Sequence, residues 1–69
     1  MRELNDPIWW GNALYGTIDG KLRKTSIVQQ VEEREDTLVA VTKNTEYELV
    51  FSGEVLREAF DKDNTGDPQ

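Results

Sequence analysis

The stretch TLVAVTKNTEYELVF, residues 37–51, combines a two-residue hydrophobic period with a turn signal at its centre. Successive side chains of a strand point to opposite faces. In the second half of the stretch Tyr47, Leu49 and Phe51 alternate with glutamates, which is the pattern of a strand with one face in water. The stretch therefore predicts a β-hairpin, and the rest of the chain must supply the other half of its core.

The turn of this hairpin is predicted at residues 43–45, between the two alternating runs. Asn44 is the residue there that best tolerates a left-handed backbone, which short hairpin loops commonly require. In the first strand Val39 and Val41 share one face, and their neighbours Leu38 and Ala40 share the other.

A second hairpin is predicted upstream, where residues 14–18 read as a strand and Asp19-Gly20 follows at once. Asp-Gly between two strand-like runs is a strong signal for a two-residue turn, because both of its central residues need a positive φ. Gly16 lies inside the first strand, where glycine often marks a bulge or a close approach of the backbone.

Residues 21–31 then read as one long strand that bends near Thr25-Ser26, with Ile27 and Val31 on one face and Val28 on the other. The next five residues, 32–36, include four carboxylates and read as a solvated turn into the central hairpin.

The period changes after residue 51, and the pattern predicts a short amphipathic helix near residues 53–62. Ser52 is its expected N-cap, and Glu54 lies in the first turn, where the helix dipole favours negative charge. A stripe at three-to-four-residue spacing consists of Val55, Leu56, Ala59 and Phe60. Such a helix is too short to be stable alone, so we expect it to cover an open face or end of the sheet.

Residues 1–12 are expected to form an N-terminal arm or a sheet edge, because Pro7 cannot donate a ladder hydrogen bond and biases Asp6 towards an extended backbone. Trp9 and Trp10 are adjacent, so only one of them is expected to plug the core. The other is either a lid over the open end of the sheet or an aromatic anchor at a protein interface.

These elements predict a mainly β protein with one C-terminal helix. The sheet is expected to be a twisted antiparallel meander or a small open SH3-like barrel of about four strands. The arm, 1–12, precedes a single β domain, 13–62, and residues 63–69 are expected to be a flexible acidic tail.

Composition limits the chemistry of this 69-residue chain. It has no cysteine and no histidine, which removes thiolate nucleophiles, the commonest general base and the usual zinc ligands. No carboxylate lies in an apolar setting that suits acid–base work. With no signal peptide or membrane span in the pattern, we expect a cytoplasmic protein that is not an enzyme and uses no cofactor.

The formal net charge is −6, with 8 Lys and Arg against 14 Asp and Glu. This balance disfavours direct binding to nucleic acid, whose phosphates it repels. The charge either keeps a small domain soluble or docks it onto a protein partner with a basic surface.

The run DKDNTGD, residues 61–67, resembles the first half of an EF-hand calcium loop. The resemblance implies oxygen ligands from Asp61, Asp63 and Thr65, with Gly66 at the turn and the Asp67 carbonyl as a further ligand. The sequence stops before the glutamate at the twelfth position, so we expect no metal site in this run.

A second resemblance joins Thr25-Ser26-x-Val28, the Val41-Thr42 pair and Tyr47-x-Leu49. These residues resemble small single-domain proteins carried by bacteriophages and prophages. The resemblance implies an origin in a mobile element, where tiny acidic proteins often inhibit host defence or transcription machinery.

The sequence thus predicts a non-catalytic, acidic protein-interaction module, of the phage-type inhibitor or adaptor kind, that acts on a host protein complex. The alternative is a homo-oligomeric structural domain, as small as a dimer, that assembles through sheet edges. The predicted partner-binding residues are Trp9 or Trp10 as the anchor, with Glu32, Glu33, Glu35 and Asp36 as the electrostatic attraction.

Overall fold

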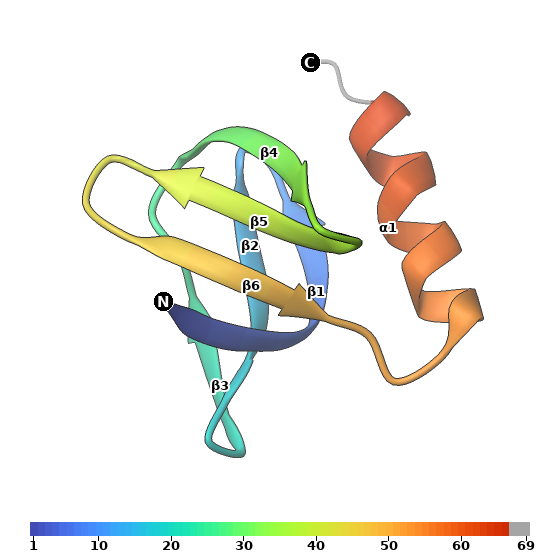
Figure 1. Ribbon diagram of the computed structural model, residues 1–69, viewed down its shortest axis with the longest axis horizontal. Helices are drawn as coiled ribbons and strands as arrows, with labels where there is room; N and C mark the ends of the chain where they lie inside the picture. The colour runs from blue at the N-terminus through green and yellow to red at the C-terminus, as the bar shows by residue number, and fades with distance from the viewer. Residues whose placement is uncertain (67–69) are drawn as a thin grey trace.

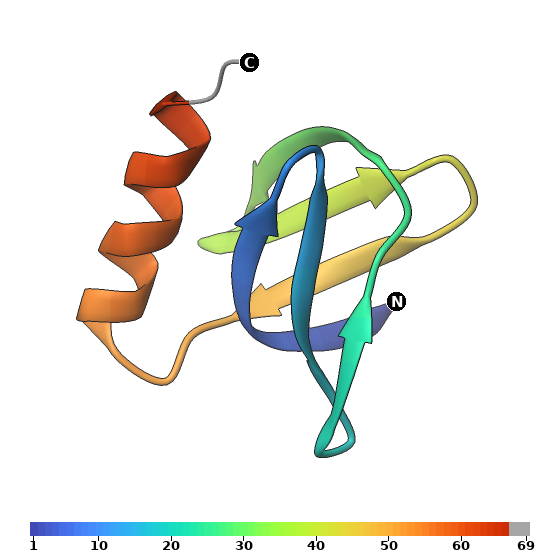
Figure 2. The same ribbon diagram turned by 180° about the vertical axis from the view of Figure 1, so that it is seen from behind.

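The structure is a computed structural model that describes the backbone of residues 1–66 and the side chains of residues 1–62. Its strands are β1 (Arg2–Trp10), β2 (Ala13–Ile18), β3 (Lys21–Lys24), β4 (Val28–Arg34), β5 (Thr37–Thr42) and β6 (Glu46–Val50), and helix α1 spans Glu54–Gly66. They form one open six-stranded sheet in the order β3-β2-β1-β6-β5-β4. The sheet coils on itself, so that β4, β5 and β6 lie in front of β2 and β3 in Figure 1 and behind them in Figure 2.

The predicted mainly β fold with one C-terminal helix is confirmed, although the sheet has six strands rather than about four. It is also mixed rather than a purely antiparallel meander, because β1 and β6 pair in parallel. This pairing places the first strand of the chain beside the last one. A local sequence pattern does not indicate a partner that is so distant in the sequence.

The central hairpin is confirmed as β5 and β6, with Leu38 opposite Leu49 and Ala40 opposite Tyr47. Its turn is held by Thr42, whose hydroxyl donates to the Thr45 carbonyl (2.8 Å) and accepts from the Thr45 amide (3.2 Å). Asn44 is not among the residues with positive φ, so the predicted left-handed residue in this turn was wrong.

The expected arm is instead the middle of the sheet. Residues 2–5 of β1 pair with β6, whereas Asn5 and residues 8–10 pair with β2, with an irregularity between Asn5 and Ile8. Pro7 lies at that irregularity, where its missing N–H removes no ladder bond, and it is buried. Asp6 has φ of 50° rather than the expected extended backbone, which bends β1 directly after Asn5, the residue that pairs with both β6 and β2 (Figure 1).

Two tight turns set the register of the outer strands. Asp19 and Gly20 have φ of 53° and 79°, the signs of the type I′ turn that the sequence predicted. Glu35 and Asp36, with φ of 50° and 68°, make a similar two-residue turn without glycine. The expected solvated turn at residues 32–36 is therefore wrong at its start, because β4 continues to Arg34.

The long strand expected at residues 21–31 is two strands, β3 and β4, separated by residues 25–27. The Thr25 amide donates to the Leu14 carbonyl (2.8 Å) and its hydroxyl accepts from the Leu14 amide (3.0 Å), which ends β3 against β2. A register shift early in β4 turns both Val28 and Val31 towards the core, whereas Ile27 is exposed. The predicted faces were wrong because a bulge adds one residue to the alternation.

The core is centred on Leu4, Leu14, Ala40, Leu49 and Phe60. Gly16 provides the predicted close approach, since a Cβ at this position would lie 2.8 Å from Cγ of Leu4. Two strands therefore meet more closely here than any larger residue would allow.

Helix α1 packs against this core mainly through Phe60, which is 2% exposed. Its ring stacks on Trp9 (5.3 Å between centroids) and meets Phe51 edge-on (5.4 Å). The predicted stripe was wrong for Val55, Leu56 and Ala59, which are exposed.

The start of the helix also differs from the prediction. The Arg57 amide donates to the Gly53 carbonyl (3.3 Å), which makes residue 53 the N-cap. Ser52 instead donates to Asp6, from its amide to Oδ1 (2.7 Å) and from its hydroxyl to Oδ2 (3.1 Å).

The helix extends to Gly66, beyond its predicted end and through most of the run that resembles a calcium loop. A helical backbone does not wrap alternate positions around an ion, so residues 61–66 do not form an EF-hand loop here. The tail expected at 63–69 thus begins inside the helix, and its last three residues, including Asp67, lie outside the described residues.

Replacing Phe60 tests how the helix is held. Phe60→Ala is expected to lower the free energy of unfolding in urea by about 3–5 kcal/mol, because it removes the one deeply buried side chain among the described residues of α1. Val55→Ala, at a side chain that is 79% exposed, is the control and should change it by less than about 0.5 kcal/mol. Equal effects of the two substitutions would show that α1 is not docked through Phe60.

Candidate functional site

The two tryptophans point to opposite sides of β1, as adjacent strand residues must. Trp9 faces inward, opposite Leu14, and stacks on Phe60 with its Nε1 buried and without a hydrogen-bond partner among the described residues. Trp10 faces outward and is 62% exposed. The prediction that only one tryptophan packs into the core is confirmed for Trp9, and Trp10 is the exposed one.

Trp10 belongs to a larger outward surface on β1, β2 and β3, which we call the aromatic face. Its members are Ile8, Trp10, Tyr15, Leu22 and Lys24. The Trp10 ring meets Tyr15 edge-on, with centroids 5.8 Å apart, and Lys24 Nζ lies 6.0 Å from the Tyr15 centroid. Ile8 is 52% exposed and Leu22 is 66% exposed. Large apolar side chains thus gather on one side of a sheet with nothing packed over them in the described chain.

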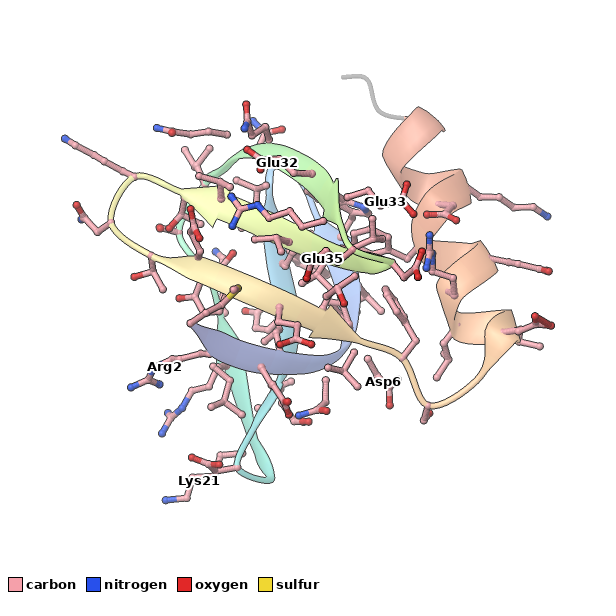
Figure 3. All side chains as sticks on the ribbon, viewed as in Figure 1. Arg2, Asp6, Lys21, Glu32, Glu33 and Glu35 are labelled. Carbon is pink, nitrogen blue, oxygen red and sulfur yellow. The ribbon has the colours of Figure 1, made fainter. Side chains whose placement is uncertain are left out.

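The four predicted acidic residues lie on the other half of the sheet, but not on one surface. Glu32 is on the outer face of β4, opposite Val39, whereas Glu33 points to the other face, opposite Leu38. Glu35 and Asp36 form the turn into β5. Figure 3 shows Glu32 near the top of β4 and Glu33 on the side towards α1.

An arginine neutralises part of this acidic region. The Arg34 guanidinium donates to both carboxylate oxygens of Glu46 (3.0 and 3.2 Å) and its Nε donates to Glu32 (2.8 Å). Glu32 also accepts from Gln30. Because Arg34 reaches across β5, it covers Val39, which is only 1% exposed on the solvent side of the sheet.

The electrostatics follow from these bonds. Hydrogen bonds to Glu46 and then to Glu32 raise the pKa of Arg34 above its already high value, and the hydrogen bond from Arg34 lowers the pKa of Glu46. Glu32 is therefore a partner in a fixed network. Of the four predicted acidic residues, Glu33, Glu35 and Asp36 are the ones that form no ion pair within residues 1–62.

The predicted anchor and the predicted acidic residues do not form one patch. The aromatic face looks out from β2, β3 and the second half of β1, which are near the viewer in Figure 2, whereas the acidic turn joins β4 and β5, which are on the side towards the viewer in Figure 1. Sequence reasoning missed Ile8, Tyr15, Leu22 and Lys24. The two-residue turns at 11–12 and 19–20 carry the signal, because they fix the register that places these residues together.

No three His, Cys, Asp or Glu side chains among residues 1–62 are gathered closely enough to hold a metal ion. The hollows on the surface are shallow, and one of them, lined by Arg34, Val39 and Glu48, lies over the arginine network. No helix within residues 1–66 is long and apolar enough to cross a membrane.

Comparisons of the chain with protein-family models, with curated proteins and with solved structures found no match.

The two hydrogen bonds from Arg34 to the Glu46 carboxylate, which we call the fork, predict that the fold loses stability in acid. Because the pKa of Glu46 is lower in the folded protein, its carboxylate stabilises the fold at every pH above the ordinary pKa of glutamate. This contribution is lost as the pH falls through the lowered pKa. Glu46→Gln should therefore lower the melting temperature at pH 7 in low salt, and the two proteins should converge below about pH 4.

Glu48→Gln is the matched control, since it removes a carboxylate from the same strand and face but leaves the fork intact. It should not reduce the melting temperature at pH 7. A difference between Glu46→Gln and the unmodified protein that grows on acidification would contradict the assignment.

Proposed function

We propose that this chain is a non-catalytic protein-interaction module that binds a protein partner through the aromatic face, with Trp10 as the anchor. The supporting observation is that Trp10 is exposed and packs against the Tyr15 ring. A tryptophan that is 62% exposed, packed on Tyr15 and beside Ile8, presents a large apolar surface without losing much side-chain freedom on binding. Trp9, the other candidate anchor, supports the core instead.

The acidic residues contribute to this function through their field rather than through the same contact. A net charge of −6 attracts a partner with a basic surface and raises the association rate over distances comparable to the Debye length. This combination fits an inhibitor or adaptor of the phage type that acts on a host protein complex in the cytoplasm.

The alternative function is a homo-oligomeric structural domain. It is favoured by the two uncovered edges of the open sheet, β3 and β4, because an edge strand is a template for another strand. Light scattering at high protein concentration distinguishes the two, since the interaction module is expected to remain a monomer.

The test of the proposed function is affinity capture from a bacterial lysate with the intact protein, Trp10→Ala and Val55→Ala. Each variant is first checked for folding by circular dichroism. A captured protein that is purified and measured directly should bind Trp10→Ala at least about thirty-fold more weakly, the effect of losing about 2 kcal/mol at an interface centre.

Val55→Ala is the control, because it removes an apolar side chain that is even more exposed than Trp10 (79% against 62%) from α1, away from the aromatic face. It should bind the captured protein as the intact chain does. If Trp10→Ala retains full affinity, the anchor is wrong, and if all three proteins only capture further copies of themselves, the oligomer is the better account.

A further inference from the structure

Strand β3 is an open edge of the sheet. All four of its residues, 21–24, are exposed, and β2 is its only neighbour among the described strands. The turn at Asp19-Gly20 places Lys21 opposite Ile18 and Arg23 opposite Gly16 as the hydrogen-bonded pairs. The Thr25 amide continues this alternation by donating to Leu14.

Because of this alternation, the backbone polar groups of the other two residues of β3 point away from β2. Leu22 and Lys24 form the pairs that are not hydrogen-bonded to β2, so their N–H and C=O groups face the open side. Each presents a donor and an acceptor at the spacing that an added strand requires.

The side chains of β3 set the chemistry of this edge. Lys21 and Arg23 project on one side of the strand, and Leu22 and Lys24 project on the other, with the aromatic face. Three cations thus flank the free backbone from both sides, in a protein whose net charge is −6. Figure 3 shows Lys21 at the tip of this hairpin, far from the labelled glutamates Glu32, Glu33 and Glu35.

Charged edges protect a protein from pairing with itself. Two copies of β3 placed side by side would bring like charges together, and the same charges repel any basic strand. They do not repel an acidic strand. The β3 edge is therefore unfavourable to a second β3 strand and to basic strands, and favourable to an acidic extended segment.

We propose that the open edge of β3 accepts an acidic, extended segment of a partner protein as a seventh strand. The docked strand pairs with the free backbone groups of Leu22 and Lys24. It carries an apolar residue beside Leu22 and acidic residues beside Lys21, Arg23 and Lys24. This site goes beyond the proposed function, because it uses a backbone edge and the opposite charge from the acidic turn.

Single-stranded nucleic acid is another polyanion that binds to basic surfaces with exposed aromatic rings, and it needs its cations on the same face as the stacking rings. Only Lys24 shares the aromatic face, whereas Lys21 and Arg23 project on the other side of β3. The arrangement therefore favours an inserted strand between two sets of cations.

The test is an NMR titration of the ¹⁵N-labelled protein with the capped peptide Ser-Glu-Glu-Val-Glu-Glu-Ser, which matches the predicted pattern in either strand direction. The peptide should bind with a Kd tighter than about 1 mM, with the largest amide shifts at Leu22 and Lys24. The same peptide with lysine in place of every glutamate should bind at least ten-fold more weakly.

Two pairs of variants separate backbone pairing from charge. Leu22→Pro removes a free N–H at an edge position that tolerates proline and should abolish binding, whereas Leu22→Thr keeps the N–H and should retain it. Arg23→Glu should weaken binding at least ten-fold, whereas Lys43→Glu, the same charge change in the distant β5–β6 turn, should have little effect.

Several results would overturn the proposal. They are the absence of saturable shifts up to about 1 mM peptide, equal losses for Arg23→Glu and Lys43→Glu, or full binding by Leu22→Pro. Saturable binding of a deoxythymidine oligonucleotide in place of the peptide would assign the surface to nucleic acid. Concentration-dependent sedimentation of the unmodified protein would assign the edge to a second copy.

Discussion

A single bend in β1 is the constraint on which the rest of this structure depends. Asp6 takes a left-handed backbone directly before a buried proline. The bend separates residues 2–5, which pair with β6, from residues 8–10, which pair with β2, and Asn5 just before it pairs with both strands. A left-handed conformation costs an ordinary residue about 1–2 kcal/mol. The carboxylate offsets this cost by accepting two hydrogen bonds from Ser52, which fixes the bend to the segment that leads into α1.

The bend decides what is inside and what is outside. Before it, Leu4 enters the core beside β6, and after it Trp9 enters the core beside β2 and receives Phe60 of the helix. The same alternation forces Trp10 outward, where it joins Tyr15. The buried aromatic stack and the exposed aromatic face are thus two sides of one strand, and the acidic turn lies on the half of the sheet that the bend separates from them.

Local patterns predicted the elements that local chemistry determines: the central hairpin, the Asp-Gly turn and the existence of the helix. They could not predict the parallel pairing of β1 with β6, which joins the first and last strands, two segments that are far apart in the sequence. Pro7 suggested an edge strand because proline cannot donate a hydrogen bond within a regular ladder. Proline is also tolerated at an irregularity such as the one in β1. The sequence also could not show which of Trp9 and Trp10 is exposed, because this depends on which side of β1 packs against the core. The pairing of Arg34 with Glu46 depended on two strands that are not adjacent in sequence or in the sheet.

The most direct test of this account is the free energy of unfolding in urea of Asp6→Asn, Asp6→Gly and Asp6→Ala. Asparagine keeps both the tolerance for the bend and one acceptor, glycine keeps only the tolerance, and alanine keeps neither. We expect stability to fall in that order, with Asp6→Ala about 2 kcal/mol below the unmodified protein. An alanine variant as stable as the unmodified protein would contradict the central role of the bend.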